Sequence, residues 1–272
     1  MSVPVSAPPR VRDLIRSAPD GPVRIVHAGP HALYVALGSR CVGVLGRDAT
    51  QVPCGLRLRI RSFADWPCRS AYVAIGTLHI DRIPLTVGRT VDVQVPPLSH
   101  GAIPRNAASP ATAAATPQAG VVGLVPQGVA LATTPLLQAG VVGLVPQVTA
   151  ATVGRLLGRG VGLTPLGDDV LCGWIATHRA AGVPTPEVDS AVRAGLHRTT
   201  LLSATLLDCA LHGEVLPELG WFLRAVGTAD ESGRAADLRA VGGTSGAGLL
   251  LGAQLALDAL AHGRAASQMG AA

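Results

Sequence analysis

The spacing of apolar residues changes along this chain of 272 residues, from every second residue to a helical period. The alternation is clearest from Leu56 to Arg61, where three aliphatic residues alternate with three arginines. Because successive side chains of a strand point to opposite faces, this segment predicts a strand with one apolar and one basic face. The order of the two periods predicts an α+β protein, with its strands first and its helices after them.

Short runs of the same kind recur up to about residue 98, separated by Gly, Pro, Asp or Asn. They cover residues 23–27, 32–37, 41–45, 71–75, 83–87 and 91–95. We therefore expect residues 1–100 to form a β-rich domain, built as an antiparallel sandwich or a partly open barrel. Its arginine face could bind an anion, although a solvated face is the more common outcome of such a pattern.

A connector is expected between the two halves, over residues 101–149. No charged residue occurs between Arg105 and Arg155, and the string QAGVVGLVPQ is present twice, at residues 118–127 and 138–147. Two copies are fewer than the three or more that a repeat architecture needs for stability. Each copy also holds a proline and two glycines, which oppose a long helix. We expect a linker or loose cover with little chemistry.

The segment 150–272 carries the helical period and the clearest helix start signals. Thr164-Pro165 and Thr185-Pro186 each place an N-cap residue before a proline at the first helical position. The expected helices run from residue 165 to 181, from 188 to 211, from 216 to 226 and from 247 to 261. The C-terminal part is therefore predicted to be a mainly α-helical domain.

Composition excludes several classes of function. All 22 positively charged residues are arginine, so no lysine can form a Schiff base, hold a phosphate in a Walker loop or act as a base. The net charge of +5 without a basic run, together with 3% aromatic residues, argues against nucleic-acid binding. No apolar span reaches about 18 residues, which argues against a membrane helix.

The cysteines indicate a reducing compartment. Five are present, at uneven spacing and without a CxxC pair that would predict a zinc site or a redox dithiol. They are Cys41, Cys54, Cys68, Cys172 and Cys209. With no apolar core of a signal peptide near residue 1, we expect a cytoplasmic protein.

The strongest candidate site is the glycine-rich segment that leads into the first long helix. Gly160, Gly162 and Gly167 surround Thr164. Glycines let a backbone turn and expose N–H groups, and a helix N-terminus adds a positive dipole end, so this segment predicts an anion-binding loop. Arg159 would act as an electrostatic clamp on the same anion.

Two adjacent carboxylates, Asp168 and Asp169, follow the glycines directly. Acidic residues in the first turn stabilise a helix by themselves, which is the simpler explanation for the pair. Neighbours on a helix point about 100° apart, so at most one is expected to face a ligand while the other caps or orients. The pair could also hold Mg²⁺ bridging to a phosphate.

Two further groups of hydroxyls accompany this segment. Thr199, Thr200 and Ser203 are predicted to share one helix face, although such hydroxyls often only bond back to preceding carbonyls. Gly243-Thr244-Ser245-Gly246 opens another helix, where an ordinary N-cap is the alternative. Two glycine-flanked loops in one helical domain suggest that both converge on one ligand.

These motifs, in this order, resemble the AllH-type oxamate carbamoyltransferase subunit family, long catalogued as a domain of unknown function. The resemblance covers roughly residues 150–260 and rests on the segment from Gly160 to Asp169, on Thr199 to Ser203 with Gly213-Glu214 after it, and on Gly243 to Gly246. It implies a multi-subunit system of purine (allantoin) catabolism that handles oxamate and carbamoyl phosphate.

The resemblance implies carbamoyl transfer, or its reverse, on a small carboxylate or amide substrate. The two loops would hold the phosphate, and Asp168 or Asp169 would accept or deliver the amide proton. No cofactor is expected, with Mg²⁺ as an option. Two alternatives stay open: a non-catalytic subunit that binds an anion or shapes an interface with other subunits or a second copy, and an Mg²⁺-assisted hydrolase.

Overall fold

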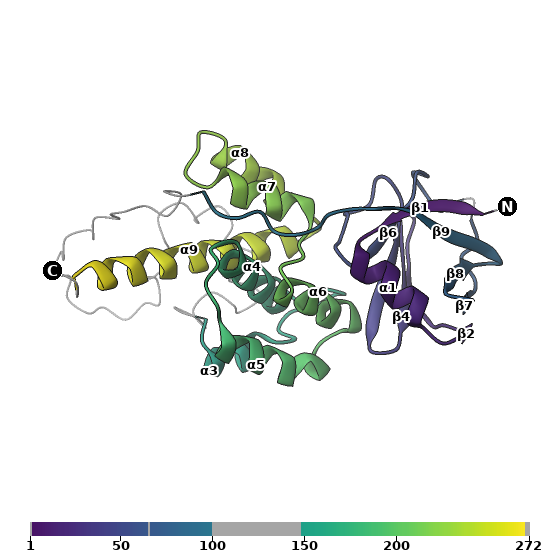
Figure 1. The fold of residues 1–272 in the computed structure, drawn as a ribbon, viewed down its shortest axis with the longest axis horizontal. Helices are drawn as coiled ribbons and strands as arrows, with labels where there is room; N and C mark the ends of the chain where they lie inside the picture. Colours follow the sequence, from purple (N-terminus) through teal and green to yellow (C-terminus); the bar gives the residue numbers. More distant parts are fainter. Residues whose placement is uncertain (1, 65, 100–147, 270–272) are drawn as a thin grey trace.

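A computed structural model describes residues 2–64, 66–99 and 148–269, with side chains up to residue 263. Its N-terminal part is a curled sheet and its C-terminal part is a set of helices (Figure 1). This arrangement confirms the predicted α+β class. The connector 101–149, with both copies of the decapeptide, lies outside the described residues except for its last two positions.

One nine-stranded sheet forms the N-terminal part, in the order β2-β7-β8-β9-β1-β6-β5-β4-β3. Its strands are β1 (Val3–Ala7), β2 (Gly21–Pro22), β3 (Ile25–Ala28), β4 (Ala32–Leu37), β5 (Arg40–Leu45), β6 (Gly55–Arg57), β7 (Ala71–Ala74), β8 (Thr77–Ile80) and β9 (Ile83–Thr90). A helix, α1 (Pro9–Ser17), covers one face with its buried Val11 and Ile15. The curled single sheet agrees with the barrel-like form that was expected, but the expected antiparallel pairing is wrong for two pairs of strands.

The sheet is mixed, because its first strand lies between two strands that come later in the chain. Strand β1 runs parallel to β9 and antiparallel to β6, and β5 and β6 are also parallel. The apolar alternation did not indicate β1, whose Pro4 interrupts the pattern, nor α1 or β8. The predicted strand 91–95 is wrong: within it, Gln94 makes a single bridge to Glu214.

Residues 91–99 instead form a strap that leaves the sheet and runs along the helices (Figure 1). The Val95 N–H donates to the Gly213 carbonyl at 2.7 Å, and the Val215 N–H donates to the Val93 carbonyl at 2.8 Å. Further on, the Leu98 N–H donates to the carbonyl of Ala180 at 2.9 Å. These backbone hydrogen bonds fix the strap and the segment around Gly213 to each other.

The helical part confirms the predicted change of period. Its helices are α3 (Ala150–Leu156), α4 (Leu166–Ala180), α5 (Pro186–Gly195), the 3-10 helix η1 (Leu196–Arg198), α6 (Leu201–Leu211), α7 (Pro217–Ala225), α8 (Glu231–Arg239) and α9 (Ser245–Met269). Within the described ranges, none of them combines the length and apolar character needed to cross a bilayer.

The single helix predicted over 188–211 is wrong, because α5 and α6 are separate. Thr199 and Thr200 have extended backbones, with ψ of −178° and 155°. The Thr200 hydroxyl accepts a hydrogen bond from the Ser203 N–H at 3.1 Å, so Thr200 is the N-cap of α6. Apolar residues continue at helical spacing across the break, which hides it from a periodicity argument.

Helices α4 and α9 cross at backbone contact. A Cβ atom added at Gly173 would lie 2.0 Å from the Leu249 carbonyl oxygen, and one at Gly252 would lie 1.9 Å from the carbonyl oxygen of Val170. Only glycine allows this approach. Helix α4 is consequently buried along most of its length, at the centre of the larger apolar core.

Gly173→Ala should therefore destabilise the fold strongly. Because a methyl group must displace the backbone of α9, we expect a loss of about 2–4 kcal/mol in the free energy of unfolding, measured by urea denaturation. Gly233→Ala on the exposed α8 is the matched control, since its Cβ meets nothing within 4 Å. That variant should gain about 0.5–1 kcal/mol from helix propensity. Equal stability of the two variants would contradict the close crossing.

Candidate functional site

A cavity of about 200 Å³ lies between the sheet and the helices. The sheet part contributes Tyr34, Thr50, Val52 and Pro53 to its wall. The helical part contributes Leu163, Thr164, Asp169, Cys172, Leu202, Leu206, Ala210, Glu214, Val215, Leu216, Leu219, Val241, Gly242, Ser245 and Leu249. Most of these side chains are apolar, so the few polar groups stand out as the candidate chemistry of the cavity.

The two glycine-flanked loops meet at this cavity. Thr164 does not cap α4, since Pro165 occupies the N-cap position. The Thr164 hydroxyl instead lies 2.7 Å from that of Ser245, the first residue of α9. Either hydroxyl can donate in this bond. The loops before α4 and α9 thus place one hydroxyl pair beside Asp169, as the sequence suggested.

The loop before α4 takes its shape from glycines with left-handed backbones. Gly158 has a φ of 71° and Gly160 a φ of 125°, values that other residues rarely adopt. Arg159, Gly160 and Gly162 are exposed and do not line the cavity, whereas Leu163 and Thr164 of the same loop do. The loop therefore leads from solvent to the cavity wall.

Asp168 is fully buried and holds this loop in place. It accepts hydrogen bonds from the Gly158 N–H at 2.8 Å, from the Thr199 hydroxyl and from Ser203. Desolvation raises the pKa of Asp168, and these three donors oppose the rise. Asp168 is not part of the cavity wall. Its contacts connect the loop before α4 to the start of α6, which is a structural role.

Asp169 is also buried, with 4% of its surface exposed, but it lines the cavity. Its Oδ2 atom has no hydrogen-bond partner among the described residues. Desolvation raises the pKa of Asp169 well above its ordinary value of 3.8; a hydrogen bond from Ser245 opposes this, and the charge of Asp168 adds to it. The two neighbouring carboxylates thus have different surroundings, and Asp169 is the one that a ligand can reach.

The starts of α4 and α9 have fewer backbone N–H groups free to bind an anion than the glycine-rich sequence suggested. The Gly167 N–H donates to the Arg159 carbonyl at 2.8 Å, and the Asp169 N–H donates to the Pro165 carbonyl at 3.2 Å. The Gly246 N–H is likewise bonded to a carbonyl, that of Val241. At Gly167 a Cβ would lie 2.1 Å from the backbone of α3, so this glycine serves packing.

The other predicted site residues divide between structural and exposed positions. Thr200 donates to the Leu163 carbonyl at 2.5 Å and caps α6, and Ser203 is buried beside Asp168. Thr199 precedes α6, so the prediction that the three hydroxyls share one helix face is wrong. Thr199 instead lines a second cavity of about 400 Å³. Gly243 and Thr244 are exposed and are not part of the first cavity's wall.

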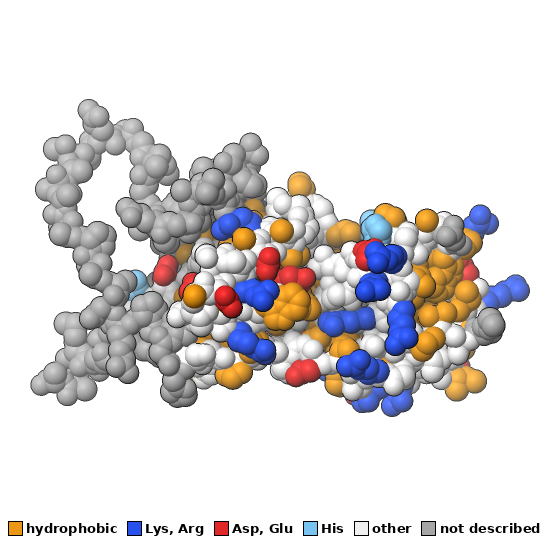
Figure 2. All heavy atoms as spheres, turned by 90° about the horizontal axis from the view of Figure 1, so that it is seen from above, with side chains coloured by type: hydrophobic (Ala, Val, Ile, Leu, Met, Phe, Trp, Pro, Cys, Tyr) orange, Lys and Arg blue, Asp and Glu red, His pale blue; other side chains and the backbone are white. Residues whose placement is uncertain are grey.

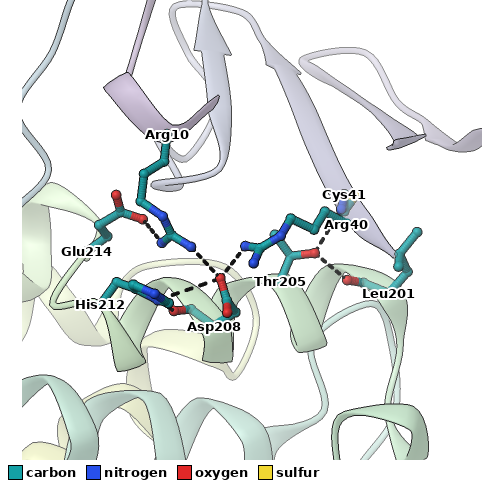
Figure 3. Close-up of polar contacts among 8 residues, drawn as sticks. All are labelled: Arg10, Arg40, Cys41, Leu201, Thr205, Asp208, His212 and Glu214. Atoms are coloured by element: carbon teal, nitrogen blue, oxygen red, sulfur yellow. Dashed lines mark hydrogen bonds and ion pairs between the residues drawn. The ribbon is translucent and has the colours of Figure 1, made fainter. Parts of the chain in front are cut away.

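Glu214 is a site residue that was not assigned a role from the sequence. It has 4% of its surface exposed and lines the same cavity as Asp169. Arg10 of α1 donates to Glu214 at 2.6 Å and to Asp208 at 2.7 Å (Figure 3). Since 204 residues separate Arg10 from Glu214, no local pattern could have indicated the pair.

Asp208 is the centre of the polar contacts between the sheet and α6. Arg40 at the start of β5 also donates to it, and the His212 ring lies 3.8 Å away (Figure 3). Burial alone would raise the pKa of Asp208, but the hydrogen bonds and charges of Arg40 and Arg10 lower it below its ordinary value. An ionised Asp208 thus binds two arginines of the sheet part, Arg10 and Arg40.

Arginine is concentrated in the sheet part. Twelve of the 22 arginines but six of the 17 acidic residues lie within residues 1–99. Figure 2 shows arginine side chains gathered in a band on the face drawn there. None of the residues that line the first cavity is an arginine or a histidine, so this positive charge lies outside the cavity.

The five cysteines are free and buried. Cys172, one turn after Asp168 on α4, lines the cavity. Desolvation raises its pKa well above the ordinary value, which keeps the thiol neutral. Across the described part of the chain, no group of three or more His, Cys, Asp or Glu side chains is placed to hold a metal ion.

Asp169→Asn should stabilise the protein at neutral pH. Because folding raises the pKa of Asp169, the folded state holds this proton more tightly than the unfolded chain does. The free energy of unfolding therefore falls as the pH rises from about 4 through the folded-state pKa, and it stays lower above that pH.

The asparagine variant removes this decline and keeps the smaller declines that come from Asp168 and Asp258, whose pKa values burial also raises. Urea unfolding of both proteins at several values between about pH 4 and pH 8 measures the difference. A variant that is less stable than the wild type at neutral pH would contradict the unpartnered burial of Asp169.

Comparisons with known proteins locate the resemblance in the helical part. Neither a search of curated proteins nor one of solved structures found a match. A family model described as "Oxamate carbamoyltransferase subunit AllH" matches residues 156–257. The matched segment contains the loop before α4, both buried aspartates, the start of α6, Glu214 and the start of α9. The helical half of this chain is therefore similar to that family, in agreement with the resemblance found in the sequence motifs.

Proposed function

We propose that this chain is a subunit of a carbamoyltransferase, and that the cavity between its sheet and its helices holds the amide or carbamoyl group that reacts. One observation carries the proposal. The buried Asp169 lines a largely apolar cavity beside the hydroxyl pair of Thr164 and Ser245, and its Oδ2 atom has no hydrogen-bond partner among the described residues. Such an oxygen is suited to exchange a proton with a bound substrate.

In the proposed transfer, the nitrogen of a small amide such as oxamate attacks the carbonyl carbon of carbamoyl phosphate. A C–N bond forms, the C–O bond to the phosphate breaks, and the phosphate leaves with the electron pair. The amide nitrogen gives its proton to Oδ2 of Asp169. In the reverse direction, protonated Asp169 returns that proton while phosphate attacks the carbamoyl group.

The hydroxyl pair has a matching role. Because Ser245 hydrogen-bonds to Asp169, Thr164 is the donor in the bond between the two hydroxyls, and its hydrogen can turn from Ser245 to a bound ligand. That hydrogen would point at the carbonyl oxygen of the carbamoyl group, where negative charge develops during the attack. The Thr164 hydroxyl would thus bind the carbonyl oxygen of the reacting group, and the Asp169 carboxylate beside it would accept the proton from the nitrogen.

The phosphate requires a separate position, because none of the residues that line the cavity is positively charged. The exposed segment from Arg159 to Gly162 joins directly to Leu163 and Thr164 of the cavity wall. We place the phosphate there, next to the arginine and to backbone N–H groups of the loop. The proposed transfer uses no cofactor, and the contacts of Asp168 with Gly158 and Thr199 argue against an Mg²⁺ ion shared by the two aspartates.

A ligand-binding subunit that needs a partner for turnover is the second candidate. The observation that favours it is the absence of Arg and His from the residues that line the cavity, because transfer from carbamoyl phosphate usually needs positive charge at the phosphate. A partner subunit, or a second copy of this chain, would supply that charge. Free, buried cysteines fit a reducing compartment such as the cytoplasm.

The activity test uses the full-length chain with carbamoyl phosphate and oxamate, and it measures phosphate release. Asp169→Asn should lower kcat by about 10²-fold or more, because the proton acceptor is lost. Ser245→Ala should lower it at least about tenfold, through the lost hydroxyl. Asp237→Asn, at an exposed position on α8, is the control and should keep full activity.

An Asp169→Asn variant with unchanged turnover would contradict the catalytic proposal. If the wild type releases no phosphate but oxamate raises its melting temperature, and Asp169→Asn removes that stabilisation, the second candidate is favoured.

A further inference from the structure

The cavity holds a second buried carboxylate whose counter-ion comes from the sheet part. Glu214 follows α6 and lines the cavity together with Asp169, although 45 positions separate the two in the sequence. One of its oxygens, Oε2, accepts from Arg10 at 2.6 Å. A carboxylate offers about four acceptor positions, so the bond to Arg10 leaves Glu214 with capacity for a ligand.

We propose that Glu214 is a substrate-binding residue that accepts hydrogen bonds from the N–H groups of the ligand, and that Arg10 is the residue that positions it. This inference rests on the proposed function, because it names the part of the substrate that enters the cavity. That part is a planar carbonyl group with at least one N–H, as in a primary amide, a carbamoyl group or a urea.

The charge of the cavity wall supports this ligand class. Its ionisable carboxyl groups are Asp169 and Glu214, and its lining includes neither arginine nor histidine. Arg10 is already paired with Glu214, so a phosphate or carboxylate beside these two groups would meet acceptor oxygens and no further cation among the lining residues. An N–H group instead satisfies an acceptor there, which burial makes costly to leave unpaired.

The remaining wall restricts the ligand further. It is formed largely by aliphatic side chains: Val52 of the sheet part, and Leu202, Leu206, Val215, Leu216, Leu219 and Leu249 of the helical part. These side chains offer no hydrogen bonds, so a ligand must direct its polar atoms to Asp169, Glu214 and the hydroxyls. A small planar group with donors on one side and a carbonyl on the other meets that requirement.

Glu214 is held from more than one side. Arg10 reaches it from α1, and the same guanidinium also donates to Asp208 of α6 (Figure 3). The backbone on both sides of Glu214 is bonded to the strap, through Gly213 to Val95 and through Val215 to Val93. The sheet part therefore fixes the direction of the Glu214 carboxylate. The sheet part thus contributes to the site and does not only cover the helices.

The test compares two ligands of equal charge, oxamate and N,N-dimethyloxamate, which lacks the N–H groups. Their dissociation constants for the full-length chain are measured by calorimetry. The wild type should bind oxamate at least about tenfold more tightly, since the analogue leaves the acceptors unpaired. Equal affinity of the two ligands would overturn the inference, and this comparison depends on no variant.

Variants then assign the preference to Glu214. Glu214→Gln replaces one acceptor oxygen by a donor, so it should weaken oxamate binding about tenfold and reduce the preference over the dimethyl analogue, since Asp169 remains as an acceptor. Arg10→Gln should reduce the preference while Asp169 and the hydroxyls stay in place. Glu187→Gln, at an exposed position of α5, is the matched control and should bind as the wild type does. Unchanged preference in Glu214→Gln would overturn the assignment.

The inference and the proposed function fail in different ways. If the chain carbamoylates oxamate and Glu214→Gln binds both ligands as the wild type does, the proposed role of Glu214 is wrong and the proposed carbamoyl transfer is supported. If oxamate neither binds nor reacts, acetamide and N,N-dimethylacetamide form the second ligand pair. A preference for acetamide that Glu214→Gln reduces would support Glu214 without carbamoyl transfer, and the absence of such a preference would overturn the inference.

Discussion

The crossing of α4 and α9 at backbone contact is the constraint on which the rest of the helical part depends. Gly173 and Gly252 bring the two helices closer than any side chain would allow. Nearer the helix starts, a Cβ at Gly248 would lie 2.8 Å from the Cβ of Asp169. Because the helices approach at this end too, Ser245 reaches Thr164, and the two loops form one wall of the cavity.

Two adjacent carboxylates have separate tasks as a result of this packing. Asp168 is satisfied by the Gly158 N–H and by the hydroxyls at the start of α6, so it stabilises the loop that leads to the cavity. Asp169 is buried, and its Oδ2 atom has no hydrogen-bond partner in the described part of the chain. Burying an acceptor in this way lowers the free energy of unfolding, a loss that packing alone would not require. A group of this kind is a common feature of functional sites, where reactivity is retained at the expense of stability.

Part of this architecture could be predicted from the sequence. The change of period predicted the α+β class, the short apolar run 32–37 predicted β4, and the glycine-flanked loops suggested the meeting of Thr164 and Ser245. The break between α5 and α6 could not be predicted, because leucines continue at helical spacing across it. The sequence also could not show which backbone N–H groups are free to bind an anion. The Gly167 N–H, for example, donates to the Arg159 carbonyl in a tight turn.

Contacts between the halves were the least predictable part. Arg10 binds Glu214, and Arg40 binds Asp208, across separations of 204 and 168 residues. Nothing in the local pattern around these arginines distinguishes them from those that face solvent. The role of the sheet part as one wall of the cavity therefore became visible only from the fold.

A crystal structure of the full-length chain grown with oxamate tests the central claim most directly, namely that the cavity between the sheet and the helices is the ligand site. The account predicts the amide end of oxamate in this cavity, within hydrogen-bond distance of Asp169 and Glu214 and next to the hydroxyls of Thr164 and Ser245. Oxamate bound elsewhere on the chain, with this cavity empty, would contradict it.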